Sequence, residues 1–390
     1  MIHILPSFAL AILGDGKTIV GTLSSNTCSW SGGTLIDAEP ERIDTTIDSG
    51  VIAALTYDGR ILAGQNTTRL DDITPKLESI MGADIACIQN ICVRGRSVVV
   101  WGGSSIGLIK LSKSINPVSA YSCTFKSEIE LISIDSEWCL VKTRDNRLFG
   151  VPIKEQSRSS LISGGAPLVL DHGTELFFRD TASITEVHAG DTWFVLLLKN
   201  CSVYGCEYYG SLSTPRPIEQ IMFPEGEIVV RIVNTGSHII YLTASNNCYE
   251  QNVTGIVNWR WYPNPTLYLT GYVIENIFPG SWSRIVIQCR EARRVGFVLV
   301  TYVVSIFPPT SNTKRIVHLP ALDGMTLVSV TCGPYYRYCF VTDDGKVYWS
   351  HNMNSNKPTL TRDTFFDANP IAAERTKAMI GSTRSILSEP

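Results

Sequence analysis

The pattern most suggestive of catalysis is Gly103-Ser104-Ser105-Ile106-Gly107, which fits the G-x-S-x-G signature of a serine nucleophile. In that signature the serine lies on a sharp turn between a strand and a helix, which exposes its hydroxyl group. The residues before it, SVVVW, are typical of a strand, but the residues after it, LIKLSKS, alternate between apolar and polar as a second strand would. A hydrolase built around Ser105 is therefore only a distant alternative, and we name no catalytic residue.

No motif in the sequence indicates metal binding or nucleotide binding. The sequence has no H-E-x-x-H motif and no Walker A loop, the common signatures of zinc hydrolases and of nucleotide binding. We therefore expect no metal site and no cofactor. The histidines are dispersed along the chain, at His3, His172, His188, His238, His318 and His351.

The eleven cysteines indicate a reducing compartment. Their number is odd, no C-x-x-C pair occurs, and most lie in apolar runs such as EWCLVKT around Cys139 and YRYCFVT around Cys339. Cysteines in such runs are typical small buried residues of strands, whereas a disulfide framework needs a secreted protein. The first residues, MIHILPSFALAIL, lack the positive charge of a signal peptide. We expect a cytoplasmic or nuclear protein.

Composition describes a globular chain of 390 residues, of which 44% are hydrophobic and 18% charged. The net charge of −3 argues against broad nucleic-acid binding, which needs an excess of Lys and Arg facing phosphates. The longest apolar run, Val295 to Phe307, is too short to cross a bilayer as a helix. We expect a monomer with no membrane segment and no direct nucleic-acid binding.

A repeated hairpin pattern runs through most of the chain. Each copy has a short apolar strand, a glycine-containing or acidic loop, a second apolar strand, a tight turn and a third strand. Asp344-Gly345 marks one turn, because Asp-Gly is a strong hairpin signal. The copies are residues 184–212, 229–252 and 327–352, then weaker ones that turn at Asp15-Gly16, Asp58-Gly59 and Asp145-Asn146, and finally residues 91–103 and 285–300.

The spacing of these hairpins predicts an all-β fold, a β-propeller. The turns lie roughly 40 to 55 residues apart, the length of a propeller blade with four short strands. We count eight hairpins but expect seven blades, with the first strands completing the last blade, and keep eight as the alternative. Residues 1–368 are assigned to the propeller and residues 369–390 to a C-terminal helix and tail. Asn369 would cap that helix, Pro370 would begin it, and helical periodicity is nearly absent before residue 365.

The repeats resemble those of the regulator of chromosome condensation family. HAGDTWFVLLLKNCSVYG, residues 188–205, is similar to the family core A-G-D-S-H-x-x-A-L-x-x-D-G-x-V-Y-x-W-G. EYYGSLSTPRP, residues 207–217, is similar to the family's N-E-Y-G-Q-L-G signature with its T-P-x-P connection. TGSHIIYLTASNNCYEQN, TDDGKVYWSHN and VVVWGGSSIGL match further parts of the core. The family histidine is replaced by Trp193 in the best copy and by Tyr336 in the last, and the Trp-Gly ending is intact only at Trp101-Gly102.

The resemblance implies a propeller, usually of seven blades, that presents loops to a protein partner. It also implies an alternative activity, guanine-nucleotide exchange on a Ran-type small GTPase. Such an exchanger acts by binding the nucleotide-free state better and needs no catalytic motif. Many loop residues of the repeats are lost and the chain has no basic N-terminal tail. We therefore favour a non-enzymatic interaction module and keep the exchange factor as the alternative.

The candidate partner-binding residues include acids and a histidine in the loops of the repeats. Asp191 occupies the A-G-D loop, where acidic residues of the family's exchange factors face the GTPase; otherwise it bonds its own loop backbone. Glu137, in DSEWCL, has a similar place and the same two interpretations. His238 is either structural, with its ring bonded to nearby backbone, or part of a partner-binding face.

Two further candidates are a charged cluster and an aromatic cluster. Arg293 and Arg294, with Arg290 and Glu291, form the densest charge in the chain, which suits either a phosphate or acidic partner or a solvated loop. Trp259 and Trp261, in NWRWYPNP, belong either to an exposed aromatic patch for protein contact or to a buried lid.

Overall fold

The structure is a computed structural model, and its secondary structure falls into eight sheets. It describes residues 2–4, 8–13, 15, 17–23, 28–34, 40–45, 50–65, 70–111, 117–135, 138–153, 168–169, 174–190, 193–207, 217–234, 238–252, 264–267, 272–279, 284–292, 296–305, 315–333, 337–350 and 358–371.

The chain divides into two compact units, residues 1–34 with 221–380 and residues 35–220 with 381–390. The first unit contains the sheets β1–β4, β22–β25, β26–β29 and β30–β33. Their strands are β1 (Ile2–Ile4), β2 (Phe8–Ile12), β3 (Thr18–Leu23), β4 (Cys28–Thr34), β22 (Val229–Asn234), β23 (His238–Thr243), β24 (Cys248–Asn252), β25 (Asn264–Leu267), β26 (Tyr272–Pro279), β27 (Arg284–Ala292), β28 (Phe297–Ser305), β29 (Arg315–His318), β30 (Leu327–Gly333), β31 (Arg337–Thr342), β32 (Val347–Ser350) and β33 (Leu360–Asp363), with the short helices η3 (Pro320–Leu322) and α2 (Phe365–Ala368).

The second unit contains the sheets β5–β8, β9–β12, β13–β17 and β18–β21. Their strands are β5 (Pro40–Thr45), β6 (Val51–Thr56), β7 (Ile61–Gln65), β8 (Asp71–Asp72), β9 (Asn90–Arg94), β10 (Ser97–Gly102), β11 (Ser105–Leu111), β12 (Pro117–Thr124), β13 (Ile129–Ile134), β14 (Trp138–Thr143), β15 (Leu148–Pro152), β16 (Leu168–Val169), β17 (Thr174–Leu176), β18 (Ile184–Ala189), β19 (Trp193–Leu198), β20 (Val203–Glu207) and β21 (Glu219–Ile221), with the helices α1 (Thr74–Met81), η1 (Gly82–Cys87) and η2 (Thr181–Ser183).

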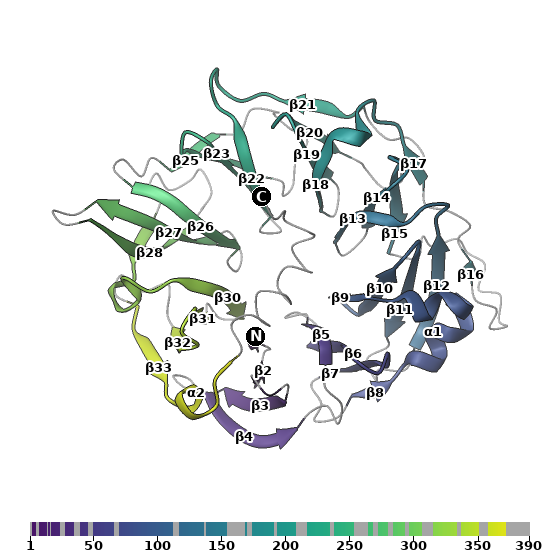
Figure 1. Ribbon diagram of the computed structural model, residues 1–390, viewed down its shortest axis with the longest axis horizontal. Coiled ribbons are helices and arrows are strands. Elements are labelled where there is room, and N and C mark those ends of the chain that lie inside the picture. The colour runs from purple at the N-terminus through teal and green to yellow at the C-terminus, as the bar shows by residue number, and fades with distance from the viewer. Residues whose placement is uncertain are drawn as a thin grey trace. The chain divides into compact units, whose positions relative to one another are not determined.

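Each sheet is an antiparallel meander of strands that follow one another in the chain (Figure 1). The exception is β16, which lies between β15 and β17 in sequence but pairs in parallel with β12 of the preceding sheet. Eight successive meanders are the blades of a β-propeller, which confirms the predicted fold class. Of the two blade counts that the sequence left open, the structure has eight rather than seven, because β1 to β4 form a sheet of their own.

The turns predicted at Asp58-Gly59, Asp145-Asn146 and Asp344-Gly345 are confirmed, and they share one design, whereas Gly16 of the turn predicted at Asp15-Gly16 lies outside the described residues. In four copies a threonine ends the second strand, and its hydroxyl group bonds the turn that follows; Thr143 Oγ1 donates to Asp145 Oδ1 at 2.5 Å and Thr342 Oγ1 to Asp344 Oδ1 at 2.5 Å. The last residue but one of each turn has a positive φ, which favours glycine and asparagine. These residues are Gly59 (82°), Asn146 (62°), Cys201 (63°), Asn246 (67°) and Gly345 (78°).

The first strand of most sheets carries a β-bulge at one equivalent position. An extra residue is inserted where the first strand pairs with the second, and it bends the strand. The shifts fall between Pro40 and Arg42, Ile129 and Leu131, Ile184 and Glu186, Val229 and Arg231, Ile274 and Asn276, and Leu327 and Ser329. A bulge repeated at one position shows that these sheets are copies of one unit.

In three sheets a polar side chain binds the first strand of the neighbouring sheet. Asp44 on β5 accepts from Val93 N at 2.8 Å, Ser133 on β13 accepts from Ala189 N at 2.9 Å, and Thr331 on β30 donates to Ile2 O at 2.7 Å. Each of these residues lies four positions beyond the start of its bulge. In these three sheets the repeated bulge therefore aims one polar side chain at the backbone of the next sheet.

Two carboxamide side chains make a second kind of link within the first unit. Asn246 donates to Tyr272 O at 2.6 Å and accepts from Ile274 N at 2.7 Å. Gln288 donates to Met325 O at 2.9 Å and accepts from Leu327 N at 3.0 Å. Ile274 and Leu327 both begin a bulge, so the two carboxamides satisfy equivalent backbone groups of successive sheets.

The first and last sheets of the chain pack together in the first unit. Ile2, Ile4 and Ala11 share one buried cluster with Val341 and Trp349. Asp363 accepts from the indole nitrogens of Trp30 at 2.8 Å and of Trp349 at 2.9 Å. The N-terminal strands thus join the C-terminal sheet by side-chain packing and not by strand exchange.

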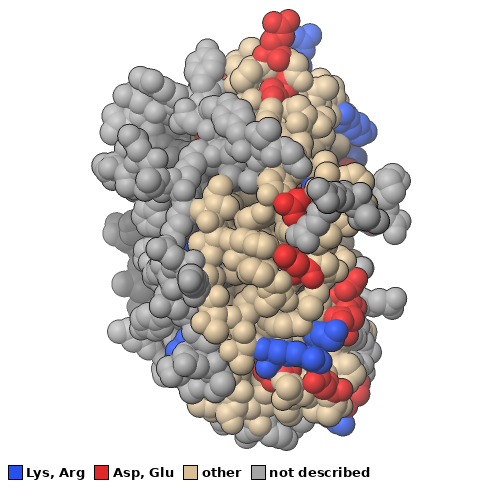
Figure 2. Space-filling model, turned by 90° about the vertical axis from the view of Figure 1, so that its left-hand side faces the viewer, with Lys and Arg blue, Asp and Glu red and all other residues tan. Residues whose placement is uncertain are grey.

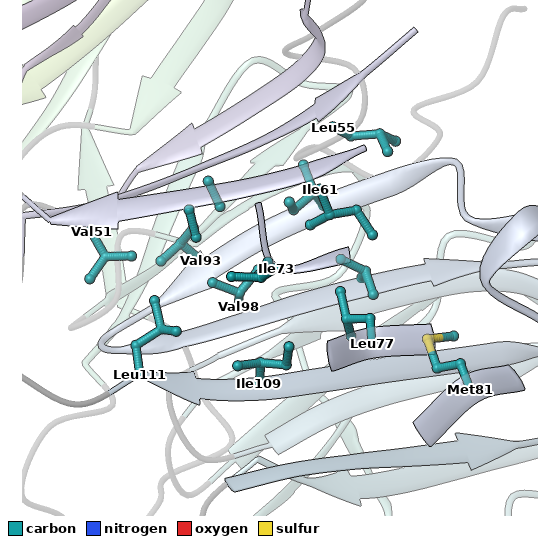
Figure 3. Close-up of a cluster of buried hydrophobic side chains, with 14 residues drawn as sticks. Val51, Leu55, Ile61, Ile73, Leu77, Met81, Val93, Val98, Ile109 and Leu111 are labelled. Atoms are coloured by element: carbon teal, nitrogen blue, oxygen red, sulfur yellow. The ribbon is translucent and has the colours of Figure 1, made fainter. Parts of the chain in front are cut away.

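A helix that the sequence analysis did not expect, α1, lies between the sheets β5–β8 and β9–β12. Its buried residues, Leu77 and Met81, are four positions apart and pack into the cluster of Figure 3. Gly107 on β11 leaves room for them, because a Cβ atom there would lie 2.2 Å from the Met81 sulfur. Two apolar positions are too few for a helical period to be recognised in the sequence.

At the C-terminus the described helix is α2, which ends at Ala368. Asn369 is its C-cap and not the N-cap of a following helix, and Pro370 and Ile371 are not helical. The rest of the predicted helix and the tail lie outside the described residues, so the assignment of residues 369–390 to a separate segment stays a prediction.

Candidate functional site

The meander gives each sheet two different ends. Tight turns join the second and third strands at one end, which we call the turn end. The connections from the first to the second strand and from the third to the fourth lie at the other end, which we call the loop end. Glu137, Asp191, Trp259 and Trp261 belong to loop-end connections, whereas Arg293 and Arg294 belong to the turn end of the sheet β26–β29. The predicted residues are therefore not all at the same end of their sheets.

Six of the seven predicted residues lie outside the described residues, and their roles stay predictions. The structure fixes only the strands that flank them, so the proposed shared face of Asp191 and His238 is also untested. The six are Glu137, Asp191, Trp259, Trp261, Arg293 and Arg294.

His238 is the predicted site residue that the structure describes, and it is the first residue of β23 at the loop end. Its side chain is 4% exposed, and its Nε2 atom lies 3.2 Å from Glu250 Oε1 on β24. Burial lowers the pKa of His238 from 6.5 to about 4, so the ring is neutral at pH 7. The structure thus gives the His238 ring a carboxylate neighbour, and the expected bond to a backbone group stays a prediction.

The position of His238 is filled by a large buried side chain in several other sheets. In each case the residue begins the second strand and pairs with the residue that ends the third. The comparison of repeats in the sequence identified Trp193 and assigned Tyr336 to the last copy, where it lies outside the described residues. The strand register identifies the equivalents Trp138, Trp193 and Arg284.

Trp193 explains the glycine of the A-G-D motif. Gly190 N donates to Trp193 O at 2.9 Å, which closes the loop that contains Asp191. A Cβ atom on Gly190 would lie 2.2 Å from the Trp193 ring, so only glycine fits beneath the indole. The motif therefore has a structural function in this sheet, whatever Asp191 contacts.

Ser105 does not have the geometry of a nucleophile elbow. Its hydroxyl group donates to Asp84 Oδ2 at 2.5 Å, lies 3.2 Å from Thr124 Oγ1, and the residue is 2% exposed. The strand β11 begins at Ser105, whereas a nucleophile elbow needs a helix there. These contacts fasten η1, which carries Asp84, to the sheet β9–β12.

A half-buried arginine that the sequence analysis did not single out joins three sheets of the second unit. Arg94 on β9 donates through Nε to Ile134 O at 3.0 Å and through a terminal nitrogen to Val93 O at 2.8 Å. Its guanidinium also lies 3.4 Å from Asp44 Oδ2 on β5. Arg94 thus contacts oxygen atoms of β5, β9 and β13. These contacts hold the first strands of the three sheets together near the loop end.

At the turn ends, charged side chains are neutralised locally. Asp15 pairs with Lys17, Asp58 with Arg60, and Asp344 with Lys346, each within one turn. The neighbouring lysine lowers the pKa of the Asp15 and Asp344 carboxyls. On the face in Figure 2, acidic and basic side chains likewise lie beside one another.

All eleven cysteines are free thiols, and seven of them are buried. Burial raises the pKa of the Cys28, Cys248 and Cys289 thiols to about 12, so they are protonated and weakly nucleophilic at pH 7. No three His, Cys, Asp or Glu residues within the described ranges are arranged to hold a metal ion. None of the described helices is long and apolar enough to cross a membrane.

Comparisons with known proteins identify relatives by structure only. No family model matches the sequence, and no curated protein matches it. Human WBSCR16 has a TM-score of 0.44 and 10% identity over 70% of this chain and 82% of its own. Prp20p from Saccharomyces cerevisiae has a TM-score of 0.44 and 11% identity over 74% of this chain and 79% of its own. Both belong to the regulator of chromosome condensation family.

Members of that family are among the solved structures to which the chain is similar. Hsv2 from Kluyveromyces lactis is similar to the same degree, with a TM-score of 0.45 and 10% identity over 82% of this chain and 96% of its own. Likenesses of this size carry no argument about activity or partners. The fold assignment rests on the eight sheets of the chain itself.

Proposed function

We propose that the chain is a non-enzymatic protein-interaction module that binds a protein partner through its loop-end connections. The observation that carries the proposal is the contrast between the two ends of the sheets. Turns of four residues recur at the turn end, at residues 57–60, 144–147, 199–202, 244–247 and 343–346.

The loop-end connections, in contrast, differ in length. Between third and fourth strands they run from four residues, 24–27, to eleven, 208–218, and to the long stretch 153–173 that contains β16. A scaffold with short turns at one end and loops of diverse length at the other is typical of folds whose binding residues lie on variable loops. We further propose that the protein acts as a monomer in the cytoplasm or nucleus.

The alternative function is guanine-nucleotide exchange on a Ran-type small GTPase, which the repeat resemblance implies. Prp20p was studied for its binding to Gsp1p and histones, so these two proteins are suitable probes. An exchanger would use the same loop end, with Asp191 facing the GTPase, and would accelerate nucleotide release without acid–base chemistry.

One experiment separates the two functions. Release of a labelled guanine nucleotide from Gsp1p is measured with increasing wild-type chain and with the Asp191→Ala variant. We expect no acceleration by the wild-type chain. A saturable acceleration that Asp191→Ala slows at least tenfold, equivalent to about 1.4 kcal/mol of transition-state stabilisation, would replace our proposal with the alternative.

A further inference from the structure

The outer edge of β12 differs from the other outer edges of the second unit. The fourth strands β8, β17 and β21 have only two or three residues, which is a common way to prevent unwanted strand pairing. The strand β12, Pro117–Thr124, has eight residues. A long edge of this kind is a template for another strand.

The chain itself places a strand on this edge. Leu168 and Val169 of β16 pair in parallel with Tyr121 and Ser122 of β12. This short strand comes from the connection between β15 and β17, so it belongs to the neighbouring sheet and reaches across to β12. It is the one parallel pairing among the sheets of the described residues.

The strand β12 is held rigid on both of its faces. The Tyr121 hydroxyl donates to Pro152 O at 2.6 Å, and Cys123 packs into a buried cluster with Phe149 and Val151 of the sheet β13–β17. On the opposite face, the Ser122 hydroxyl donates to Ile80 O of α1 at 2.9 Å. Figure 1 shows α1 beside β11 and β12. A template that is already ordered loses little entropy when a strand binds to it.

We propose that the outer edge of β12 is a docking site for an extended segment of a protein partner, bound in parallel through two adjacent aliphatic residues. The segment's chemistry is inferred from β16, whose Leu-Val pair occupies the edge in cis. Main-chain hydrogen bonds supply affinity in such strand addition, and alternate side chains supply specificity. Because β16 contributes only two residues, a longer partner segment forms more of these bonds and displaces it.

The site is the edge of the strand β12, although β16, which covers it, belongs to one loop-end connection, residues 153–173. Peptide binding at β12 is measured separately from partner capture by the other loops, so either proposal can fail without the other. A tethered strand competes at an effective concentration on the order of millimolar. Removing β16 from the edge should therefore strengthen the binding of a free peptide. The probe is a fluorescein-labelled peptide with the chain's own residues 165–172, GAPLVLDH.

The test compares peptide binding to the wild-type full chain and to the double variant Leu168→Pro, Val169→Pro. Proline cannot donate to a strand ladder, so the variant frees the edge. We expect the variant to bind the peptide at least tenfold more tightly than the wild type. Hydrogen exchange of the complex should show new protection at residues 117–124.

Two controls test whether the effect comes from the edge of β12 rather than from the rest of the connection, residues 153–173. The variant Ile162→Pro, Ser163→Pro places the same prolines outside β16 and should bind like the wild type. A peptide with prolines in place of Leu168 and Val169 should not bind. If the double variant does not fold, a chain in which residues 165–172 are replaced by a Gly-Ser linker of equal length takes its place. Equal affinity for wild type and variant, or protection away from β12, would overturn the proposal.

Discussion

At the scale of the residue, a few buried polar side chains join sheets that lie far apart in the sequence. Asp363 binds two indole nitrogens, one from the first sheet and one from the last, and also accepts from Phe365 N at 3.1 Å. A buried donor that loses its acceptor costs more free energy than the bond itself contributes. Single substitutions at such residues should therefore reveal which contacts stabilise the fold.

The Asp363→Ala variant should be less stable than the wild type by about 1 to 3 kcal/mol, because the indole of Trp349, 1% exposed, loses its acceptor. Urea unfolding measures the change. The control is Asp367→Ala, which removes an exposed ion pair with Arg362 and should change stability by less than about 0.5 kcal/mol. Equal effects of the two variants would show that the indole contacts do not stabilise the junction.

His238 should make the stability of the protein depend on pH. Its folded pKa of about 4 lies below the unfolded value of 6.5, so the unfolded chain binds the proton more readily. The stabilisation is complete above pH 6.5 and is lost as the pH falls towards 4. Between pH 7 and pH 4.5 the wild type should lose about 2 to 3 kcal/mol more of its unfolding free energy than His238→Gln. Parallel pH profiles of the two proteins would rule out this role.

At the scale of the element, the repeated bulge determines how successive sheets meet. It leaves equivalent backbone groups at the start of each first strand, and Asn246 and Gln288 satisfy two of them. The same bulge directs Asp44, Ser133 and Thr331 to the next sheet. Adjacent sheets are thus aligned by hydrogen bonds as well as by apolar packing.

The Gln288→Met variant should be destabilised by about 2 to 4 kcal/mol. It keeps the size and shape of the side chain but leaves Leu327 N and Met325 O buried without this partner. Asn200→Ala serves as the control, because it removes an exposed carboxamide that accepts from Ser202 N only within its own turn. Thermal unfolding of both variants measures the difference, and a Gln288→Met variant as stable as the control would refute the aligning function.

Parts of this organisation can be predicted from the sequence because they depend on local chemistry. The turns at Asp58-Gly59, Asp145-Asn146 and Asp344-Gly345 were predicted from residue types that tolerate a positive φ. The helix α1 was missed because only Leu77 and Met81 mark its buried side. The inter-sheet bonds of Arg94 and Gln288 depend on which strands become neighbours, and that information is not in any local pattern.

The repeat pattern in the sequence predicted where His238 lies in its sheet. It did not predict that the His238 ring would lie beside Glu250. Glu250 lies on the next strand and is brought to His238 by the diagonal register of β23 and β24. The equivalents Trp138 and Arg284 were not found, since their sequences differ from the family pattern and only strand pairing aligns them.

At the scale of the whole molecule, the fold joins its first sheet to its last through the hairpin of β31 and β32. One side of this hairpin, with Cys339, Val341 and Trp349, packs on the first sheet. The other side, with Tyr338 and Phe340, packs in a cluster with Phe278 and Val286 of the sheet β26–β29. A hairpin buried on both sides cannot be removed without exposing two apolar surfaces.

Deleting residues 338–349 should therefore cause aggregation, because two buried clusters become exposed. Removing residues 382–390 should leave the unfolding midpoint unchanged within experimental error. Size-exclusion chromatography and thermal unfolding measure both variants. A tail deletion as damaging as the hairpin deletion would contradict our view of how the chain ends.

The central claim, that loop-end connections bind a protein partner, is tested most directly by exchanging loops at the two ends. Residues 208–218 and 253–263 are replaced by Gly-Ser sequences of equal length in one variant. In the other, the turn residues 57–60 and 199–202 are exchanged with each other. Proteins retained by each immobilised chain are quantified against the wild type. We expect a protein bound by the wild type to be lost from the loop-end variant and kept by the turn-end variant; loss from the turn-end variant alone would contradict the account.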